Sequence, residues 1–183
     1  MGHTIMVYKT VELTDCRKAI LNWLKKEDMP EVMKVLNDVI KEGIYLLMNN
    51  EITDIEQELA WFERGTKEGM CYLVAIVEGK VVGGASIHPK TDKHAHIASY
   101  GVFIQKSYRN LGLGTALTKE LVEIAKKRGV EILQLSVYAT NKRAINVYQK
   151  CGFKEAGRLK NGIKFPDGTY ADEIIMELLL NQL

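Results

Sequence analysis

Apolar residues recur at spacings of three and four in five segments of the chain, and this spacing predicts amphipathic helices. The segments are residues 16–24, residues 29–40, a stretch that follows Thr53, residues 115–128 and residues 142–150. Pro30 fits the first turn of the second helix, because proline lacks the N–H group that would be unbonded there. Thr53 is expected to cap the third helix, with Glu56 three residues later completing a capping box.

Runs of apolar and β-branched residues predict strands between these helices. The expected strands are residues 5–11, 95–104, 132–137, 153–159 and 174–180, with a hairpin within residues 71–87 that turns at residues 78–80. Gly83 and Gly84 in this hairpin indicate a strand that is crowded by a neighbour. No linker, repeat or low-complexity tract interrupts this series of expected helices and strands. The pattern therefore predicts one α/β (α+β) domain over residues 1–183.

The bulk composition limits the class of protein. A chain of 183 residues is enough for one substantial core and too short for two ordinary domains. The 46% hydrophobic and 26% charged residues are typical of a soluble globular protein, and a net charge of +2 argues against nucleic acid or acidic membranes as partners. Three cysteines without paired spacing indicate reduced thiols, and we expect a cytoplasmic protein with no membrane span.

One segment, residues 102–116 (VFIQKSYRNLGLGTA), joins an expected strand to an expected helix through two glycines. Gly112 and Gly114 allow a tight turn and the close approach of a ligand, and the free N–H groups of the following helical turn attract phosphate. Arg109 and Thr115 add a cation and a hydroxyl donor, so this segment could hold a diphosphate.

Two other interpretations apply to parts of this segment. Two glycines at this spacing can form a simple turn between strand and helix. A P-loop requires a lysine that is missing here, and a dinucleotide fingerprint requires a third glycine where Leu117 stands.

Two blocks of sequence together resemble the GCN5-related N-acetyltransferase (GNAT) superfamily. Residues 109–114 (RNLGLG) resemble its Arg/Gln-x-x-Gly-x-Gly/Ala signature, and residues 138–153 (YATNKRAINVYQKCGF) are similar to a later motif with Asn, Ala and Tyr ahead of Gly-Phe. The resemblance covers roughly residue 72 to the C-terminus. It implies a mixed, mostly antiparallel twisted sheet with splayed central strands, flanked by helices, and acetyl-CoA as cosubstrate. Asn110 and Leu111 depart from the family, whose members often carry Gly and a basic residue there.

The resemblance also implies roles for individual residues. Backbone groups of Phe103 and Ile104 would bond the pantetheine arm, aided by the amide of Asn141. Tyr148 would lie near the cofactor sulfur as general acid, because a phenol remains protonated at neutral pH until the thiolate leaves. The diphosphate would be held by the glycine segment, namely Arg109, Asn110, Leu111, Gly112, Leu113, Gly114 and Thr115.

The general base is less defined. Relatives often place an acid on the strand before the glycine segment, where this chain has Ser99 and Tyr100. Glu51 and His96 are the remaining side-chain candidates, and the alternatives are a water-mediated route or an acceptor that arrives neutral.

A group of histidines raises the question of a metal. His88, His94 and His96 lie near Asp92 in the sequence. No cysteine or helix-spaced histidine pair completes a zinc site, so we expect no metal and a solvated hairpin loop.

The C-terminal run resembles the branch of the superfamily that includes acetyltransferases for L-amino acids, polyamines and ribosomal-protein N-termini. Tyr170, Asp172 and Glu173 could read a cationic amine there. We therefore expect an acetyl-CoA-dependent N-acetyltransferase that acts on a primary amine by direct transfer, with Cys151 serving packing rather than an acetyl-enzyme. The alternative is an acetyl-CoA or CoA sensor with weak or no catalysis. Exposed strand edges and the apolar C-terminal run make a homodimer plausible.

Overall fold

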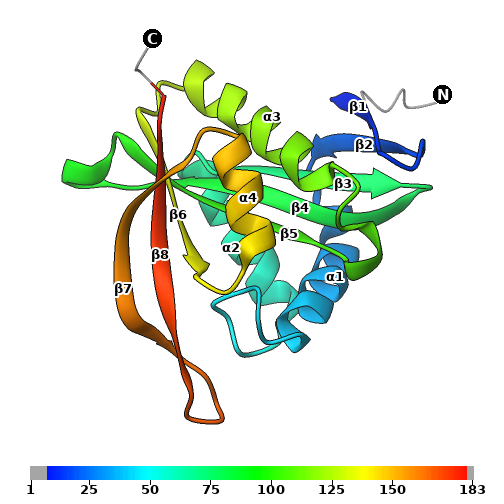
Figure 1. The fold of residues 1–183 in the computed structure, drawn as a ribbon. Coiled ribbons are helices and arrows are strands. Elements are labelled where there is room, and N and C mark those ends of the chain that lie inside the picture. Colours follow the sequence, from blue (N-terminus) through cyan, green and yellow to red (C-terminus); the bar gives the residue numbers. More distant parts are fainter. Residues whose placement is uncertain (1–7, 181–183) are drawn as a thin grey trace, which may run out of the picture.

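The computed structural model describes residues 8–180, which form an eight-stranded sheet with helices on both faces (Figure 1). Its helices are α1 (Met29–Lys41), α2 (Ile55–Lys67), α3 (Leu113–Lys127) and α4 (Lys142–Lys150). Its strands are β1 (Lys9–Glu12), β2 (Lys18–Trp23), β3 (Cys71–Val77), β4 (Lys80–Pro89), β5 (Ile97–Ile104), β6 (Ile132–Tyr138), β7 (Lys154–Lys164) and β8 (Tyr170–Leu179). None of the helices in this range combines the length and the hydropathy that a bilayer span requires.

The strand order is β1-β2-β3-β4-β5-β6-β8-β7, and every neighbouring pair is antiparallel except β5 and β6. These two parallel strands pair only from Ile97 with Ile132 to Ser99 with Gln134. Within the described residues they then diverge, as Figure 1 shows at the centre of the sheet. The predicted fold class, a mostly antiparallel sheet with splayed central strands, is confirmed.

The two faces of the sheet bury separate cores, because successive side chains of a strand point to opposite faces. On one face, Leu117 and Leu121 of α3 pack with Leu73 of β3. On the other face, Val32 of α1 packs with Val74, the next residue of the same strand. All five of these side chains are buried. The sheet is therefore covered by a packed helix on each face.

Two local predictions were wrong. Residues 16–24 are not a helix, because Ala19 and Leu21 alternate inward along β2, which pairs with both β1 and β3. The cap of α2 is Asp54 rather than Thr53, since the Asp54 carboxylate accepts from the N–H groups of Glu56 and Gln57 at 3.0 Å each. The strand expected at residues 5–11 begins outside the described residues, and β1 starts at Lys9.

The crowding expected at Gly83 leads to a prediction about stability. A Cβ at this position would lie 2.7 Å from the Phe103 carbonyl oxygen, so Gly83→Ala must displace the β4–β5 backbone. We expect the free energy of unfolding, measured with urea, to fall by about 1–3 kcal/mol. Gly157→Ala in β7 is the matched control, because a Cβ there meets nothing within 4 Å. Equal stability of the two variants would refute this account of the glycine.

Candidate active site

The divergence of β5 and β6 opens a cavity of about 680 Å³. Its walls are residues 99–104 of β5 and 134–137 of β6, the glycine turn with the first turn of α3, the inner face of α4, and the loop that follows α1. Because β5 and β6 no longer pair here, their main-chain groups face the cavity rather than each other. An extended ligand with amide groups could therefore bond to them in the manner of an added strand.

The glycine turn presents free backbone donors at one end of this cavity. Gly112 precedes α3 with φ of +85°, a left-handed conformation that favours glycine. The first helical N–H that finds a carbonyl is that of Ala116, which donates to Gly112 at 3.0 Å. Within residues 8–180, no bond engages the N–H groups of Leu113, Gly114 and Thr115. This end of the cavity is thus suited to an anion such as phosphate.

The other residues of the turn are fixed by the protein around them. Asn110, where relatives often have glycine, takes φ of +63°, and asparagine tolerates this left-handed region better than most residues. The Leu111 carbonyl accepts from the N–H of Thr14 at 3.2 Å, and the Leu113 side chain is buried in the core. Leu113 could therefore contact a ligand only through its backbone, and neither leucine belongs to the walls of the cavity. Gly114 is close-packed, since a Cβ there would lie 3.2 Å from Ile104 Cδ1.

Arg109 lines the cavity, but its guanidinium is already paired within the protein. Nε donates to the Ile104 carbonyl at 2.9 Å, and the two terminal nitrogens bind both carboxylate oxygens of Glu42, one of them at 2.8 Å. The Arg109 guanidinium holds the pKa of the Glu42 carboxyl below its usual range. The expected contact of Arg109 with a diphosphate stays a prediction, and the free N–H groups of α3 are the better placed donors.

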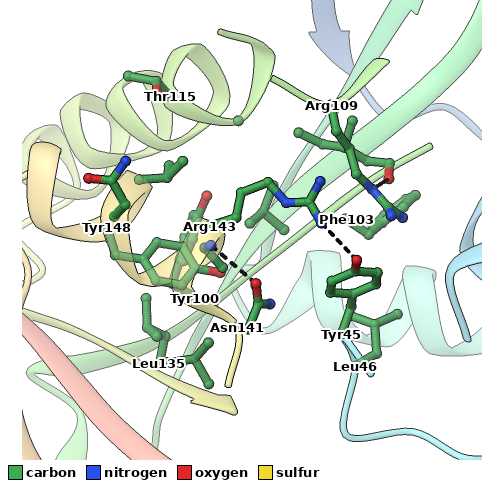
Figure 2. Close-up of a pocket in the computed structure, with 18 of the residues that line it drawn as sticks. Tyr45, Leu46, Tyr100, Phe103, Arg109, Thr115, Leu135, Asn141, Arg143 and Tyr148 are labelled. Carbon is green, nitrogen blue, oxygen red and sulfur yellow. Dashed lines mark hydrogen bonds between the residues drawn. The ribbon is translucent and has the colours of Figure 1, made fainter. Parts of the chain in front are cut away.

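The loop after α1 is held over the cavity by aromatic residues (Figure 2). The Tyr45 ring lies against two guanidinium groups, with Arg109 at 4.5 Å and Arg143 of α4 at 5.2 Å from its centroid. Arg143 also donates to the Tyr45 hydroxyl at 2.7 Å, and the Tyr138 hydroxyl donates to the Leu46 carbonyl at 2.7 Å. The two hydrogen bonds join residues 98 and 92 positions apart in the chain, and all these contacts together close one side of the cavity.

Tyr148 of α4 places its hydroxyl at the cavity. Its ring packs edge-on against Tyr100 at 6.1 Å and against Phe153 at 5.9 Å. In the described part of the chain the Tyr148 hydroxyl has no hydrogen-bond partner. Every fully buried polar side-chain atom there has one, so the Tyr148 hydroxyl is not fully buried and reaches the open space of the cavity. Burial raises the pKa of Tyr148, which keeps the phenol protonated. By contrast, the Tyr100 hydroxyl is tied to Thr118 at 2.8 Å.

Three further predicted contacts also line the cavity. Phe103 and Ile104 belong to the end of β5 that pairs with β4 but not with β6. The Asn141 side-chain oxygen caps α4 by accepting from the N–H of Ala144 at 3.2 Å, which leaves its amide NH₂ available to donate (Figure 2). The structure thus brings these residues together with Tyr148 and the glycine turn, although they are spread over 45 positions from Phe103 to Tyr148.

The two predicted base candidates lie elsewhere. Glu51 is exposed and pairs with Lys41 at 3.1 Å, and His96 is exposed beside β5. Neither belongs to the walls of the cavity. In residues 8–180 no group of three or more potential metal ligands lies together, and His88 is half-buried whereas His94 and His96 are exposed.

A second cavity of about 440 Å³ lies on the α2 side of β4 and β5. Five residues border both cavities, namely Leu46, Leu47, Gly101, Val102 and Phe103. The second cavity is mostly apolar, and its polar residues are Glu58, Ser86 and His88, with Trp61 and Tyr72 beside them. Sequence reasoning missed this cavity. The available signal was the polar pair Ser86 and His88, spaced by two in an otherwise apolar strand.

Comparison with known proteins gives a consistent result. Residues 19–153 match the family described as acetyltransferase (GNAT) family. The L-amino acid N-acetyltransferase AaaT of Escherichia coli (strain K12) is 32% identical over 119 residues, which cover 63% of this chain and 73% of that protein.

Solved structures are also similar. A ribosomal-protein-alanine N-acetyltransferase from Brucella melitensis superposes with a TM-score of 0.82 at 28% identity, covering 87% of this chain and 99% of that one. A GNAT superfamily phosphinothricin acetyltransferase from Sinorhizobium meliloti, solved in complex with AcCoA, has a TM-score of 0.82 and covers 88% of each chain. Its identity is 20%, so this second likeness concerns the fold alone.

Proposed function

This chain belongs to the acetyltransferase (GNAT) family, and from that premise we propose that it transfers the acetyl group of acetyl-CoA directly to a primary amine in a ternary complex. One observation carries the proposal. The unpaired strand ends, the free N–H groups of α3 and the Tyr148 hydroxyl all face the same cavity. A diphosphate, an extended thioester arm and an acid for the leaving thiolate require these three features.

The proposed cofactor contacts follow from this arrangement. The N–H groups of Leu113, Gly114 and Thr115 would hold the diphosphate, with the Thr115 hydroxyl as a further donor. The amide of Asn141 and main-chain groups of Phe103 and Ile104, other than the Ile104 carbonyl that Arg109 engages, would bond the pantetheine arm. The cofactor would then extend from the start of α3 into the space between β5 and β6.

The proposed reaction needs two proton movements. The amine nitrogen attacks the thioester carbonyl, so that a C–N bond forms and the C–S bond breaks. Tyr148 donates its proton to the departing sulfur, which leaves as the CoA thiol. The Tyr148 phenol is protonated at neutral pH and therefore carries the proton that the departing thiolate needs, and burial, which raises its pKa, keeps it protonated. The amine must also lose a proton. The second cavity, on the α2 side of the sheet, could hold the base that takes it.

Direct transfer is favoured over an acetylated cysteine. Burial raises the pKa of the Cys151 thiol, which disfavours the nucleophilic thiolate. Cys151 also directly follows α4 as its C-cap and is not among the residues that line the large cavity. Neither property suits a residue that must attack the thioester.

The proposed acceptor site is the second cavity, because Gly101 and its neighbours connect it with the first. The similarity to AaaT supports an amino acid or a related amine as acceptor. Apolar side chains such as Leu36, Met48 and Trp61 line the cavity and favour an acceptor with an apolar body. Glu58 is the one carboxylate among its described residues and suits an ammonium group.

The test is release of CoA thiol from acetyl-CoA in the presence of an amine panel. We expect turnover with L-phenylalanine, L-leucine or their carboxylate-free counterparts 2-phenylethylamine and 3-methylbutylamine. Spermidine and a peptide with an N-terminal alanine are expected to be poor acceptors, because neither has a side chain that fills the apolar cavity. Acetyl-CoA binding, measured by calorimetry, without turnover of any amine would favour the sensor alternative.

Three broader predictions accompany this function. We infer that residues 1–183 form one domain, since β1 and β8 belong to the same sheet and α3 packs on that sheet. A homodimer is supported by the exposed apolar side chains Leu159, Tyr170 and Leu179 on the β7–β8 hairpin at the sheet edge. A cytoplasmic location agrees with the free cysteines Cys16, Cys71 and Cys151.

A further inference from the structure

A pair of polar side chains, Ser86 and His88, lies on the α2 side of β4. Alternate residues of a strand share one face, so both side chains point into the second cavity. His88 is bonded through Nε2 to Ser86 Oγ at 2.9 Å. The centroid of the His88 ring also lies 5.5 Å from that of the Trp61 ring of α2.

The register of the sheet links this pair to the proposed reaction centre. Ser86 is the direct cross-strand partner of Gly101, and His88 is the partner of Ser99. Gly101 borders both cavities, and a Cβ added there would meet nothing within 4 Å. Cross-strand partners lie about 4.5–5.5 Å apart at Cα. The space above Gly101, open to both cavities, is therefore within reach of the Ser86 hydroxyl.

We propose that His88, acting through the hydroxyl of Ser86, takes the proton that the acceptor amine loses. This inference rests on the proposed function. An acceptor that enters as ammonium has by then released one proton to water. The amine lone pair forms the C–N bond with the thioester carbonyl carbon and an amine N–H bond breaks, its proton passing to Ser86 Oγ while the Ser86 proton passes to His88 Nε2. As the C–S bond breaks, the CoA thiolate takes a proton from Tyr148, and the imidazolium proton returns to the tyrosinate through water, so charge and atoms balance.

The state of the imidazole suits this task. Burial lowers the pKa of His88, so the ring is neutral at neutral pH and Nε2 can accept a proton. The other titratable residues of this cavity, among those the structure describes, are Glu58 from α2 and Tyr72 from β3. Burial raises the pKa of both groups. A protonated Tyr72 is neutral, and Glu58 is the competing proton acceptor.

Geometry favours His88 over Glu58. Ser86 is hydrogen-bonded to the His88 imidazole and is also the cross-strand partner of Gly101. Glu58 has no hydrogen-bond or ion-pair partner among residues 8–180 that links it to β5. Glu58 is placed to attract a cationic amine into the cavity. His88 is thus assigned the role of base and Glu58 the role of attracting the amine, and kinetic measurements on variants distinguish the two roles.

The experiment compares His88→Gln with wild type, using acetyl-CoA with L-phenylalanine and with 2-phenylethylamine. Glutamine can still bond to Ser86 but does not take up a proton. We expect kcat/KM at pH 7 to fall about 100-fold. The wild-type profile should bend downward below the lowered pKa of His88, and His88→Gln should lack this bend. Added imidazole should restore part of the rate to His88→Ala.

Three control measurements distinguish a loss of the base from other effects of the substitution. His94→Gln, an exposed histidine outside both cavities, should match wild type. Glu58→Gln should raise KM for the amine while keeping the acidic bend. Calorimetry should give unchanged acetyl-CoA affinity for His88→Gln, which shows that the variant is folded.

Two outcomes would overturn the inference alone. In one, His88→Gln keeps the wild-type rate and profile. In the other, Glu58→Gln is the variant that loses the bend, which makes Glu58 the base. If wild type binds acetyl-CoA yet releases no CoA with any amine, the proposed function itself fails, and this inference fails with it.

Discussion

Tyr148→Phe is expected to lower kcat by about 100-fold or more while leaving the affinity for acetyl-CoA unchanged. The variant loses the acid that protonates the departing sulfur, and the thiolate must then leave unaided. The fold should tolerate the change, because the Tyr148 hydroxyl has no hydrogen-bond partner in residues 8–180 and the ring contacts with Tyr100 and Phe153 persist. Steady-state kinetics with saturating acetyl-CoA, together with calorimetry, measure both quantities.

Tyr100→Phe is the matched control. This second buried tyrosine lies 6.1 Å from the Tyr148 ring, but its hydroxyl is bonded to Thr118. Thr118 Oγ1 in turn donates to the Gly114 carbonyl at 2.7 Å, so the Tyr100 hydroxyl is the donor of its own bond. Its removal should cost about 1 kcal/mol of stability. A Tyr148→Phe enzyme with the wild-type kcat, or a Tyr100→Phe enzyme with the larger loss, would contradict the assignment.

Arg109→Met is expected to destabilise the protein by about 2–3 kcal/mol, measured by urea unfolding at pH 7. Removal of one partner from a buried ion pair leaves the other charge unpaired, at a cost of about 3–5 kcal/mol when burial is complete. The Arg109 side chain is 10% exposed and the Glu42 side chain 23%, so the cost should be somewhat lower. The loss of Arg109 also removes one of the two cations against Tyr45, and KM for acetyl-CoA should rise as the loop loosens.

The pH dependence of stability separates this effect from lost packing. Because Arg109 lowers the pKa of Glu42, the pair stabilises the fold above the ordinary carboxyl pKa of 4.5, and this contribution is lost as the pH falls through the lowered value. Arg109→Met should therefore approach wild-type stability as the pH falls. The double variant Arg109→Met, Glu42→Gln should recover part of the loss at pH 7. An unchanged difference from pH 7 to the acid limit would show that the charge pair contributes little.

The glycine segment illustrates what the sequence could predict. Local patterns located the helices that became α1, α3 and α4, and the strand that became β5, because each has an apolar face of matching period. The order of Gly112, Asn141 and Tyr148 carried the family resemblance, and the structure places all three around one cavity. Helices, strands and turns of this kind can be predicted because short stretches of sequence determine them.

Features that depend on distant partners could not be predicted. Residues 16–24 carry apolar residues at spacings that fit a helix, yet pairing with β1 and β3 makes them a strand. Arg109 was expected to meet phosphate, but its carboxylate partner Glu42 lies 67 positions earlier in the chain. The second cavity likewise requires α2 and β4 to meet across the sheet, and no local pattern specifies that contact.

The most direct test of this account is a crystal structure of the protein with CoA bound. The account places the diphosphate at the N–H groups of Leu113, Gly114 and Thr115, the pantetheine arm between β5 and β6, and the sulfur within hydrogen-bond reach of the Tyr148 hydroxyl. A diphosphate bound elsewhere, or a sulfur turned away from Tyr148 and Gly101, would contradict it.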